Sequence, residues 1–579
     1  MAPVDFWVLA AYLAGTLALG FVYAGRNRRP RDMFAAGRRS PWWVSGLSSF
    51  MTLKSAGTFV VWGGLAYREG VVAMAINTCI GVSGLLVGTF IAGRWRRTGV
   101  TTPAEFVELR FGPSAVQLYT WAMLGIRLVW GGVALYSVSV IFAALVPLEP
   151  GHVLRDPQTG HLSIAFIALL FGAIVLTYTA AGGLWAVLMT DVLQFIVLQL
   201  SVLFLIVLLW MQVRSGVPLA TVPATFLSPT SAQYTSWFLA GWVAVHFFLV
   251  GAEWAFAQRY ICVPSERDAR WSAWLFGALY LVSPTLWLLP TLLFRWLDDS
   301  VDPEQAFILA SQRVLPAGML GLMVAAMFSA TASSLSAHIN VFSGVLTEQF
   351  YGRFVRPLAD ERERIRAGRT FAVAIGLALI GMATIVPRIG GAEQIVLTVT
   401  GLLLGPLMAP TVWGLWNGRI GIRTVFVTVL GSFAAGAFVR FAMGEGGAFA
   451  RWPMAHWTQA NPRIADVLVG AVLPVLLLAT AQAFSREVSP RWRDVQQRLA
   501  DYRPTPPDDE GAIESGSAKV AAIALAGSGV VMLGLFAHHG AAHPALAAFA
   551  TALLLIAALT WFVATRMART PVQAMDNGS

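Results

Sequence analysis

The sequence predicts an all-α polytopic membrane protein, and three features of the chain support this prediction. Of its 579 residues, 57% are hydrophobic and only 12% are charged, and the mean hydropathy is +0.67. The apolar residues form about fifteen stretches close to the ~20 residues that a helix needs to cross a bilayer. Arginine clusters follow alternate stretches, as expected for a protein whose basic loops all lie on one side of a membrane.

The expected spans alternate with polar loops along the whole chain. In order, they cover about 4–24, 41–67, 72–93, 115–146, 162–181, 183–213, 236–258, 270–296, 315–347, 369–388, 393–416, 421–442, 463–484, 519–537 and 545–565. If the first arginine cluster is cytoplasmic, every later one is too, and the acidic stretch from Asp298 to Glu304 is outside. We therefore expect an integral protein of a bacterial cytoplasmic membrane, with the N-terminus outside and the C-terminus inside.

Composition also argues against several classes of function. The net charge of +10 does not indicate a nucleic-acid partner, because the arginines are distributed among alternate loops. Cys79 and Cys262 lie in or beside different spans, so neither a disulfide framework nor a cysteine-based metal site is expected. No metal-ligand cluster, nucleophile elbow or phosphate-binding loop is recognisable. We therefore expect a protein that is not an enzyme and has no cofactor.

The second expected span contains the most informative run, from Ser48 to Gly64. Three glycines and several hydroxyl residues weaken this helix just past its middle, and at the same depth stands Lys54, which costs at least ~2.5 kcal/mol at a bilayer centre. Irregular backbone at this depth is tolerated only where it lines a cavity, as in transporters with midplane sites. The run therefore predicts a helix break beside such a site.

Lysine is rare in this chain. Of the 40 lysine and arginine residues only two are lysines, Lys54 and Lys519. Arginine stays charged, whereas a buried lysine can release its proton near neutral pH. Lys54 is therefore a candidate for a cation site or for proton coupling. The structural alternative is a lysine that binds the loose carbonyl groups around the break.

Four stretches in the order of the chain resemble motifs of the sodium:solute symporter family. These are Thr101 to Gly112, Tyr178 to Gln194, Gln258-Arg259-Tyr260, and Ala325 to Ser336. The family includes sodium-coupled galactose, proline and sialic acid transporters. The resemblance extends from about residue 5 to about residue 440.

The resemblance implies a core of ten helices in two inverted five-helix repeats, with the first and sixth core helices broken near Gly57 and Gly251. It places the repeats at 41–213 and 236–416. The other expected segments are 1–40, an extra transmembrane helix and a cytoplasmic basic loop; 417–485, two additional helices; 486–518, a cytoplasmic linker; and 519–579, two C-terminal transmembrane helices and a tail.

The family's sodium site lies between the broken first core helix and the eighth. Carried over by motif, it uses carbonyl groups at Met51 and Lys54 and, on the eighth helix, positions Ala326, Ser329 and Ala330. Ala330 lacks the hydroxyl group of the family, so one oxygen ligand for a hard cation is missing. An ammonium group offers three donors to the remaining oxygens. We therefore expect Lys54 to replace a sodium ion; the alternative is that Lys54 points elsewhere and a weakened sodium site persists.

A second sodium site of the family involves Asp191, with Ser333 as its expected hydroxyl partner. An acidic residue inside the membrane is a functional candidate by default. Asp191 is expected to hold Na⁺, to pair with Lys54 or to carry a proton. The structural alternative is a carboxylate that caps or pairs near a helix end.

Two further charges at membrane depth are candidates for solute binding. Arg127, on the third core helix, has a guanidinium fork suited to a carboxylate and is similar to an arginine that binds the substrate in sialic acid transporters. Glu253, near the second break, would suit a substrate amine. Alternatively, Glu253 neutralises Arg127 or Lys54. The other residues expected to line the cavity are Thr58, Trp62, Trp130, Trp254 and Phe256.

The sequence therefore predicts secondary active transport of a small organic solute by alternating access. Arg127 favours an organic acid or an amino acid, and Lys54 favours proton coupling or sodium independence. Two alternatives remain: a sodium-coupled symporter that uses Asp191, and a transporter-like sensor that works with a separate signalling protein.

Overall fold

The structure, a computed structural model, describes residues 1–24, 38–157, 159–178, 184–215, 220–504, 510–539 and 544–567. Throughout these residues the chain is helical apart from its loops and two isolated β-bridges. Parts of the expected basic loop (25–37), of the Tyr178 to Gln194 motif (179–183) and of the linker (505–509) lie outside the described residues, as does the tail from residue 568.

The described helices confirm a polytopic all-α protein. Ten are long and apolar enough to cross a membrane, and one bent pair of helices forms a further candidate span. The other expected spans coincide with α1 (Pro3–Ala24), with α3 (Trp42–Thr52), η2 (Thr58–Trp62) and α4 (Gly63–Glu69) taken together, with α9 (Ile164–Tyr178) and with α24 (Glu510–His539).

The remaining helices between residues 72 and 214 form the rest of the first expected repeat. They are α5 (Val72–Phe90), α6 (Ala92–Arg97), α7 (Pro103–Phe111), α8 (Pro113–Leu145) and α10 (Leu184–Arg214). After the short η4 (Ala224–Leu227), the second expected repeat contains α11 (Ser236–Ala252), α12 (Trp254–Ile261), α13 (Glu266–Leu297), η5 (Pro303–Gln305), α14 (Ala306–Val314), α15 (Met319–Val345), η6 (Leu346–Val355), α16 (Glu361–Ile385), η7 (Val386–Ile389), α17 (Gly391–Val399), η8 (Thr400–Leu404) and α18 (Gly405–Trp416).

Both expected helix breaks are present. The first core helix leaves α-helical geometry after Thr52, becomes helical again at Ala56 and continues from Thr58 as a five-residue π-helix. The second break lies at Glu253, where α11 and α12 meet at an angle of 54°. Glycine and hydroxyl residues weaken the first helix, whereas the second bends at an extended residue whose side chain caps the next helix.

Breaking a helix inside the membrane frees backbone groups that must find other partners. At the first break, the N–H of Ala56 donates to Oγ1 of Thr331 on α15, at 2.9 Å. At the second, the carbonyl of Gly251 accepts a hydrogen bond from Nε1 of Trp95 on α6, at 2.7 Å. Neighbouring helices of the core thus stabilise the irregular backbone around the two breaks.

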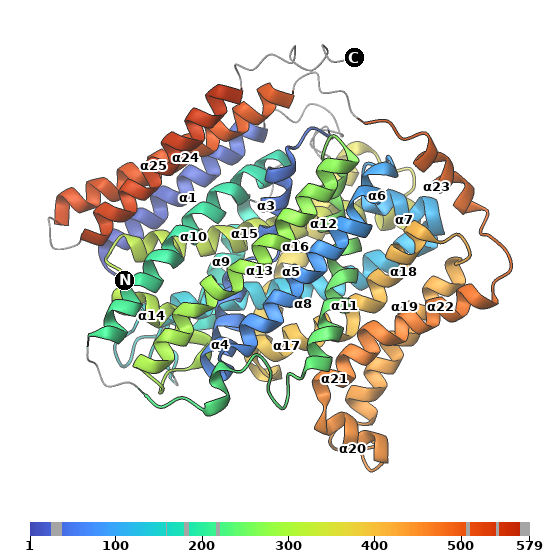
Figure 1. Cartoon of the computed structure of the whole chain (residues 1–579), viewed down its shortest axis with the longest axis horizontal. Helices are drawn as coiled ribbons and strands as arrows, with labels where there is room; N and C mark the ends of the chain where they lie inside the picture. The colour runs from blue at the N-terminus through green and yellow to red at the C-terminus, as the bar shows by residue number, and fades with distance from the viewer. Residues whose placement is uncertain are drawn as a thin grey trace, which may run out of the picture.

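Further helices surround this core. They are α19 (Ile422–Ala437), η9 (Phe438–Ala442), α20 (Pro453–Ala460), α21 (Pro462–Val467), η10 (Leu468–Val472), α22 (Leu473–Phe484), α23 (Arg491–Ala500) and α25 (Pro544–Met567). The α24–α25 pair lies against α1 and α10 on the outer surface (Figure 1). Asp5 ties α1 to the core, because its Oδ1 accepts the N–H groups of Gly318 and Gly321 at the start of α15.

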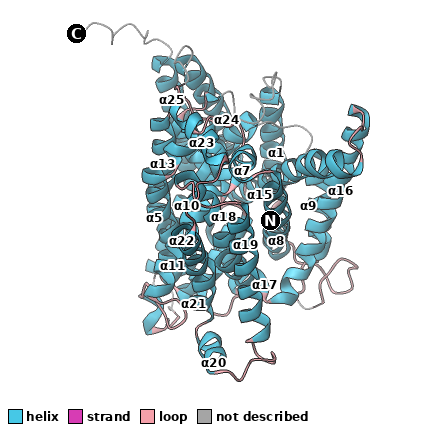
Figure 2. Ribbon diagram, turned by 90° about the vertical axis from the view of Figure 1, so that its right-hand side faces the viewer, coloured by secondary structure: helices cyan, strands magenta, loops and turns pink. Residues whose placement is uncertain are grey.

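The two ends of the bundle differ in charge. We call the end that carries α6, α7 and α23 the arginine-rich end; it includes Arg94, Arg96, Arg97 and Arg110. The opposite end carries η5 and the acidic stretch from Asp298 to Glu304, and we call it the acidic end. Figures 1 and 2 both show α20 projecting at this acidic end, away from α23.

Candidate functional site

A pocket lies beside the break in the first core helix and on the acidic side of the break in the sixth. About 620 Å³ of space lies between its walls, including the open mouth. Sixteen residues line it: Leu53, Lys54, Ser55, Gly57, Thr58, Val61, Trp62, Ile80, Trp130, Val133, Ala134, Trp242, His246, Tyr280, Val396 and Thr400. They come from the first break with η2, and from α5, α8, α11, α13, α17 and η8. Pockets at helix breaks near the midplane are where transporters of this architecture bind solutes.

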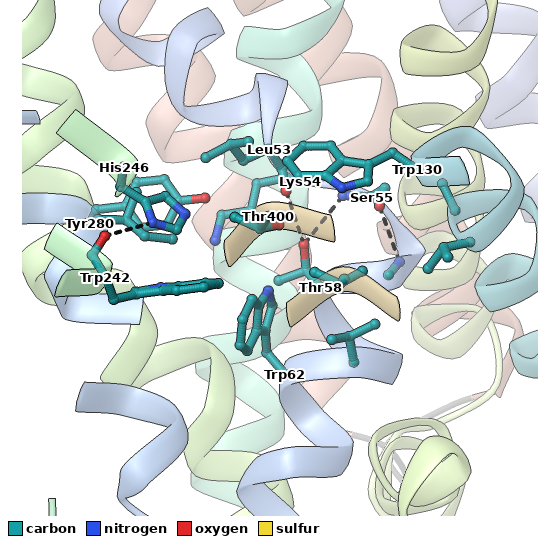
Figure 3. A pocket seen from close by; sticks show the side chains of 16 residues that line it. Leu53, Lys54, Ser55, Thr58, Trp62, Trp130, Trp242, His246, Tyr280 and Thr400 are labelled. Atoms are coloured by element: carbon teal, nitrogen blue, oxygen red, sulfur yellow. Dashed lines mark hydrogen bonds between the residues drawn. The ribbon is translucent and has the colours of Figure 1, made fainter. Parts of the chain in front are cut away.

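Lys54 is the charged residue of the pocket. Its side chain is 3% exposed, and its Nζ lies over the rings of Phe50, Tyr280 and Trp287, at 4.8, 4.3 and 4.7 Å from their centroids. Three electron-rich faces stabilise an ammonium group in a dry site. Among the described residues, Nζ has no hydrogen bond and no carboxylate partner. Figure 3 shows the side chain pointing toward Tyr280 and His246.

The other polar side chains of the pocket are mostly held in place by the backbone. Nδ1 of His246 donates to the carbonyl of Trp242 at 3.0 Å, so the second nitrogen of a neutral ring is an acceptor. Oγ1 of Thr58 accepts the N–H of Ser55 at 3.3 Å, and Oγ of Ser55 accepts the N–H of Gly57 at 3.1 Å. These bonds close the unwound turn around Lys54 in place of helical hydrogen bonds.

Arg127 and Glu253 form a buried ion pair with each other, one on α8 and the other between α11 and α12. The carboxylate of Glu253 also accepts the N–H of Ala255 at 3.0 Å and so caps α12. Neither residue lines the pocket. Along α8, Arg127 lies about one turn nearer to the arginine-rich end than Trp130. The pair therefore lies between the pocket and that end.

Asp191 belongs to a second buried cluster. Its Oδ2 accepts a hydrogen bond from Oγ of Ser48 on α3 at 2.6 Å and lies 3.9 Å from Nη2 of Arg259 on α12. Nε of Arg259 also donates to the same Ser48 hydroxyl at 3.2 Å. This cluster joins α3, α10 and α12. Within the part of the chain that the structure describes, Asp191 makes no hydrogen bond or ion pair with Lys54 or Ser333.

The residues expected at the first sodium site lie on facing helices, but their polar groups already have partners. The carbonyl of Met51 accepts the N–H of Lys54 at 2.8 Å, and Oγ of Ser329 accepts a hydrogen bond from Nε2 of Gln194 at 2.8 Å. Ala326 and Ala330 are buried on α15. In this conformation the ammonium of Lys54 contacts rings on α3 and α13 and does not hydrogen-bond to Ser329.

The remaining expected residues divide between the pocket and its surroundings. Thr58, Trp62 and Trp130 line the pocket. Trp254 and Phe256 are buried on α12, and Phe256 contacts Phe276 on α13 at 5.5 Å between ring centroids. They support the half-helix after the second break and do not belong to the pocket wall.

Four polar or aromatic lining residues were not identified from the sequence: Trp242, His246, Tyr280 and Thr400. A signal was present for His246, because an ionisable residue inside an apolar span is a functional candidate by the same rule that singled out Lys54. Thr400 begins the π-helix η8, and π-helical turns occur frequently at functional sites. Trp242 and Tyr280 had no such signal, since aromatic residues are common throughout the spans.

Comparison with known proteins places this geometry in a family. The sequence model of the sodium:solute symporter family matches residues 33–431. The sodium/sialic acid symporter of Aliivibrio fischeri is 24% identical over 465 residues, covering 76% of this chain and 88% of that protein. The sodium/glucose cotransporter of Vibrio parahaemolyticus is 26% identical over 491 residues, covering 76% of this chain and 85% of the cotransporter.

A solved structure has the same fold. It is a Na⁺-coupled sialic acid symporter in a substrate-bound outward-open state. The two structures match with a TM-score of 0.62 and 19% sequence identity, and the match covers 82% of this chain and 98% of the symporter chain. The family and these relatives are transporters rather than enzymes. The match over most of the core, together with two broken helices around one pocket, shows that this chain belongs to the sodium:solute symporter family.

Proposed function

We propose that this chain is a secondary active transporter of a small organic solute with a carboxylate group, and that the solute binds beside Lys54. The observation that carries the proposal is the position of the Lys54 ammonium. It lies at the wall of the pocket, at the break of the first core helix, without an anionic partner among the described residues. A carboxylate in the pocket would supply that partner.

The charge balance of the surrounding helices supports this proposal. Two other buried cations each have a carboxylate, since Arg127 pairs with Glu253 and Arg259 lies near Asp191. Lys54 differs from these two, because its ammonium has neither a carboxylate nor a hydrogen-bond partner among the described residues, whereas the buried Arg96 and Arg110 donate to backbone carbonyl groups. An unpaired buried charge is costly, so an anionic solute gains binding energy by neutralising it.

We further propose that Lys54 replaces sodium in function rather than in position. A sodium ion bound beside an anionic solute contributes positive charge, and the tethered ammonium contributes it permanently. Ala330 has no hydroxyl group, and the hydroxyl of Ser329 already binds Gln194, which leaves the sodium position poor in free oxygen ligands. Transport is then sodium-independent or proton-coupled. Loss of the Lys54 proton would remove the pocket's charge and favour another conformation.

The alternative is sodium-coupled symport through Asp191. It is favoured by the buried carboxylate itself and by the relatives, which are sodium symporters. The nearby guanidinium of Arg259 weighs against it, because it already balances the carboxylate. Movement of α12 away from α10 would separate Arg259 from Asp191 and leave the Asp191 carboxylate available to a cation.

Sodium dependence is tested by thermal unfolding of the purified protein in NaCl and in choline chloride. A ligand that binds only the folded state raises its melting temperature by mass action. We expect the same melting temperature in both salts for the wild type and for Lys519→Met, the control at the only other lysine. Stabilisation of the wild type by NaCl would show a retained sodium site and favour the Asp191 alternative.

Transport is tested by uptake of labelled acetate, lactate, glutamate and benzoate into proteoliposomes. We expect at least one of these carboxylates to accumulate above the level in liposomes with Lys54→Met at the same protein density, which corrects for passive entry of weak acids. Binding without accumulation of any bound solute would instead support a sensor.

A further inference from the structure

The pocket contains buried hydrogen-bond donors that have no partner. Nε1 of Trp130, Nε1 of Trp242 and Oγ1 of Thr400 are buried, and among the described residues none of them makes a hydrogen bond. All three residues line the pocket together with Lys54. Buried polar groups in folded proteins are almost always satisfied, so each exception needs an explanation. Other buried polar atoms of the described residues also lack a partner, but these three line one cavity together with the Lys54 ammonium, and this combination points to a ligand that accepts hydrogen bonds.

The pocket wall also carries positive charge, from Lys54, and no negative charge. None of its sixteen lining residues is an aspartate, glutamate, asparagine, glutamine or arginine. An indole N–H and an ammonium group only donate, and the side-chain acceptors of the wall are hydroxyl groups and the imidazole of His246. The wall therefore offers no carboxylate to a cationic group and no amide to the alternating donors and acceptors of a sugar.

The remaining surface is aromatic and apolar. The rings of Trp62, Trp130, Trp242 and Tyr280 line the pocket, and Figure 3 shows all four around the side chains of Lys54 and Thr58. Flat rings bury a large area against such faces and prefer stacked or edge-to-face contacts. An aliphatic chain would fill the same space without this geometric match.

We infer that the solute is an aromatic carboxylate without an ammonium group. Its carboxylate accepts hydrogen bonds from Lys54 and the free donors, and its ring packs against the aromatic wall. The inference rests on the proposed function and narrows it: an amino acid is set aside, because Glu253, the carboxylate that would suit an amine, is held by Arg127 outside the pocket.

The test uses thermal unfolding of the purified full chain with four related probes, each built on one six-membered ring. They are phenylacetate, its neutral amide phenylacetamide, the zwitterion phenylalanine, and cyclohexylacetate, in which the ring is saturated. Phenylacetate is expected to raise the melting temperature by several degrees. The amide and phenylalanine are expected to give no shift, and cyclohexylacetate a clearly smaller one than phenylacetate.

Paired variants connect this binding to the pocket. Lys54→Met is expected to weaken phenylacetate binding by about tenfold or more, because a charge-assisted hydrogen bond is lost, whereas Lys519→Met leaves it unchanged. Thr400→Val is expected to weaken binding by several-fold. Thr428→Val is its control, because the Thr428 hydroxyl is also buried without a hydrogen-bond partner among the described residues but lies on α19, outside the pocket.

The outcomes separate this inference from the proposed function. If acetate or lactate is transported but phenylacetate neither binds nor competes, the aromatic class is wrong and the transport of carboxylates stands. If phenylalanine stabilises the protein more than phenylacetate does, the exclusion of amines is wrong. If phenylacetamide binds as well as phenylacetate and Lys54→Met changes nothing, both the inference and the role of Lys54 are wrong.

Discussion

Lys54 and Glu253 show how the partner of a charged residue decides its role. Both are charged, buried and next to a helix break. Glu253 has Arg127 as a partner and caps α12, so its charge is used within the protein. Among the described residues, the ammonium of Lys54 contacts three aromatic rings and has no ion-pair partner, and such rings stabilise a cation without neutralising it. The free charge is therefore available to a solute.

The Arg127–Glu253 pair predicts a marked difference between single and double substitutions. Glu253→Gln keeps an oxygen to accept the N–H of Ala255 but leaves Arg127 unpaired, which is expected to cost about 3–5 kcal/mol of stability. Adding Arg127→Met removes the orphaned charge and is expected to restore most of that loss. Thermal or denaturant unfolding in detergent measures both.

The exposed pair of Arg364 and Glu348 provides the control, because a surface ion pair contributes only about 0–1 kcal/mol. Glu348→Gln is therefore expected to change stability little. A Glu253→Gln variant as stable as the wild type would mean that water reaches Arg127 and that the pair is not sealed from solvent.

At the scale of the element, the pocket depends on helices that depart from regular geometry. The unwound turn after Thr52, the π-helix η2 and the π-helix η8 all contribute lining residues. Each departure turns side chains toward the cavity and frees backbone groups. The core satisfies some of these groups from other helices, as Thr331 does for Ala56.

Thr331→Val is expected to destabilise the first break by about 1–3 kcal/mol, because the N–H of Ala56 loses its acceptor while the shape of the side chain is kept. Thr331→Ser retains the hydroxyl group and is the matched control. Melting temperature measures the loss, and faster amide exchange over residues 53–58 would locate it. Equal stability of the two variants would show that water replaces the threonine hydroxyl.

At the scale of the whole molecule, the arrangement suggests which side of the pocket is closed. The Arg127–Glu253 pair and the Asp191 cluster join α3, α8, α10 and α12. The pair lies between the pocket and the arginine-rich end, so release of a solute toward that end requires the pair to move. We propose that the arginine-rich end faces the cytoplasm, with the N-terminus outside and the C-terminus inside.

This orientation predicts opposite labelling of two loops in a variant in which Cys79 and Cys262, both buried, are replaced by serine. Val153 and Leu358 are 95% and 99% exposed, on loops at opposite ends of the bundle. A cysteine introduced by Val153→Cys is expected to react with an impermeant maleimide from outside intact cells. One introduced by Leu358→Cys is expected to react only in inverted vesicles. Labelling of both from the same side would contradict the topology.

The sequence alone determined the all-helical membrane fold, the order of the spans and the presence of two breaks, and it singled out Lys54 as a candidate site residue. These features depend on local composition: a run of apolar residues must span the bilayer, and glycine with a buried charge must interrupt a helix. Even here, the position of the second break at Glu253 came from the structure.

Only the tertiary structure decided which polar groups meet. It paired Arg127 with Glu253, turned Lys54 toward Tyr280, and brought Trp242 and Thr400 to the same cavity. These residues lie far apart in the chain, and their contacts depend on how neighbouring helices pack and rotate. Hydropathy determines whether a helix lies in the membrane. Packing determines which face of that helix reaches the pocket, because the partner of each polar side chain lies on another helix.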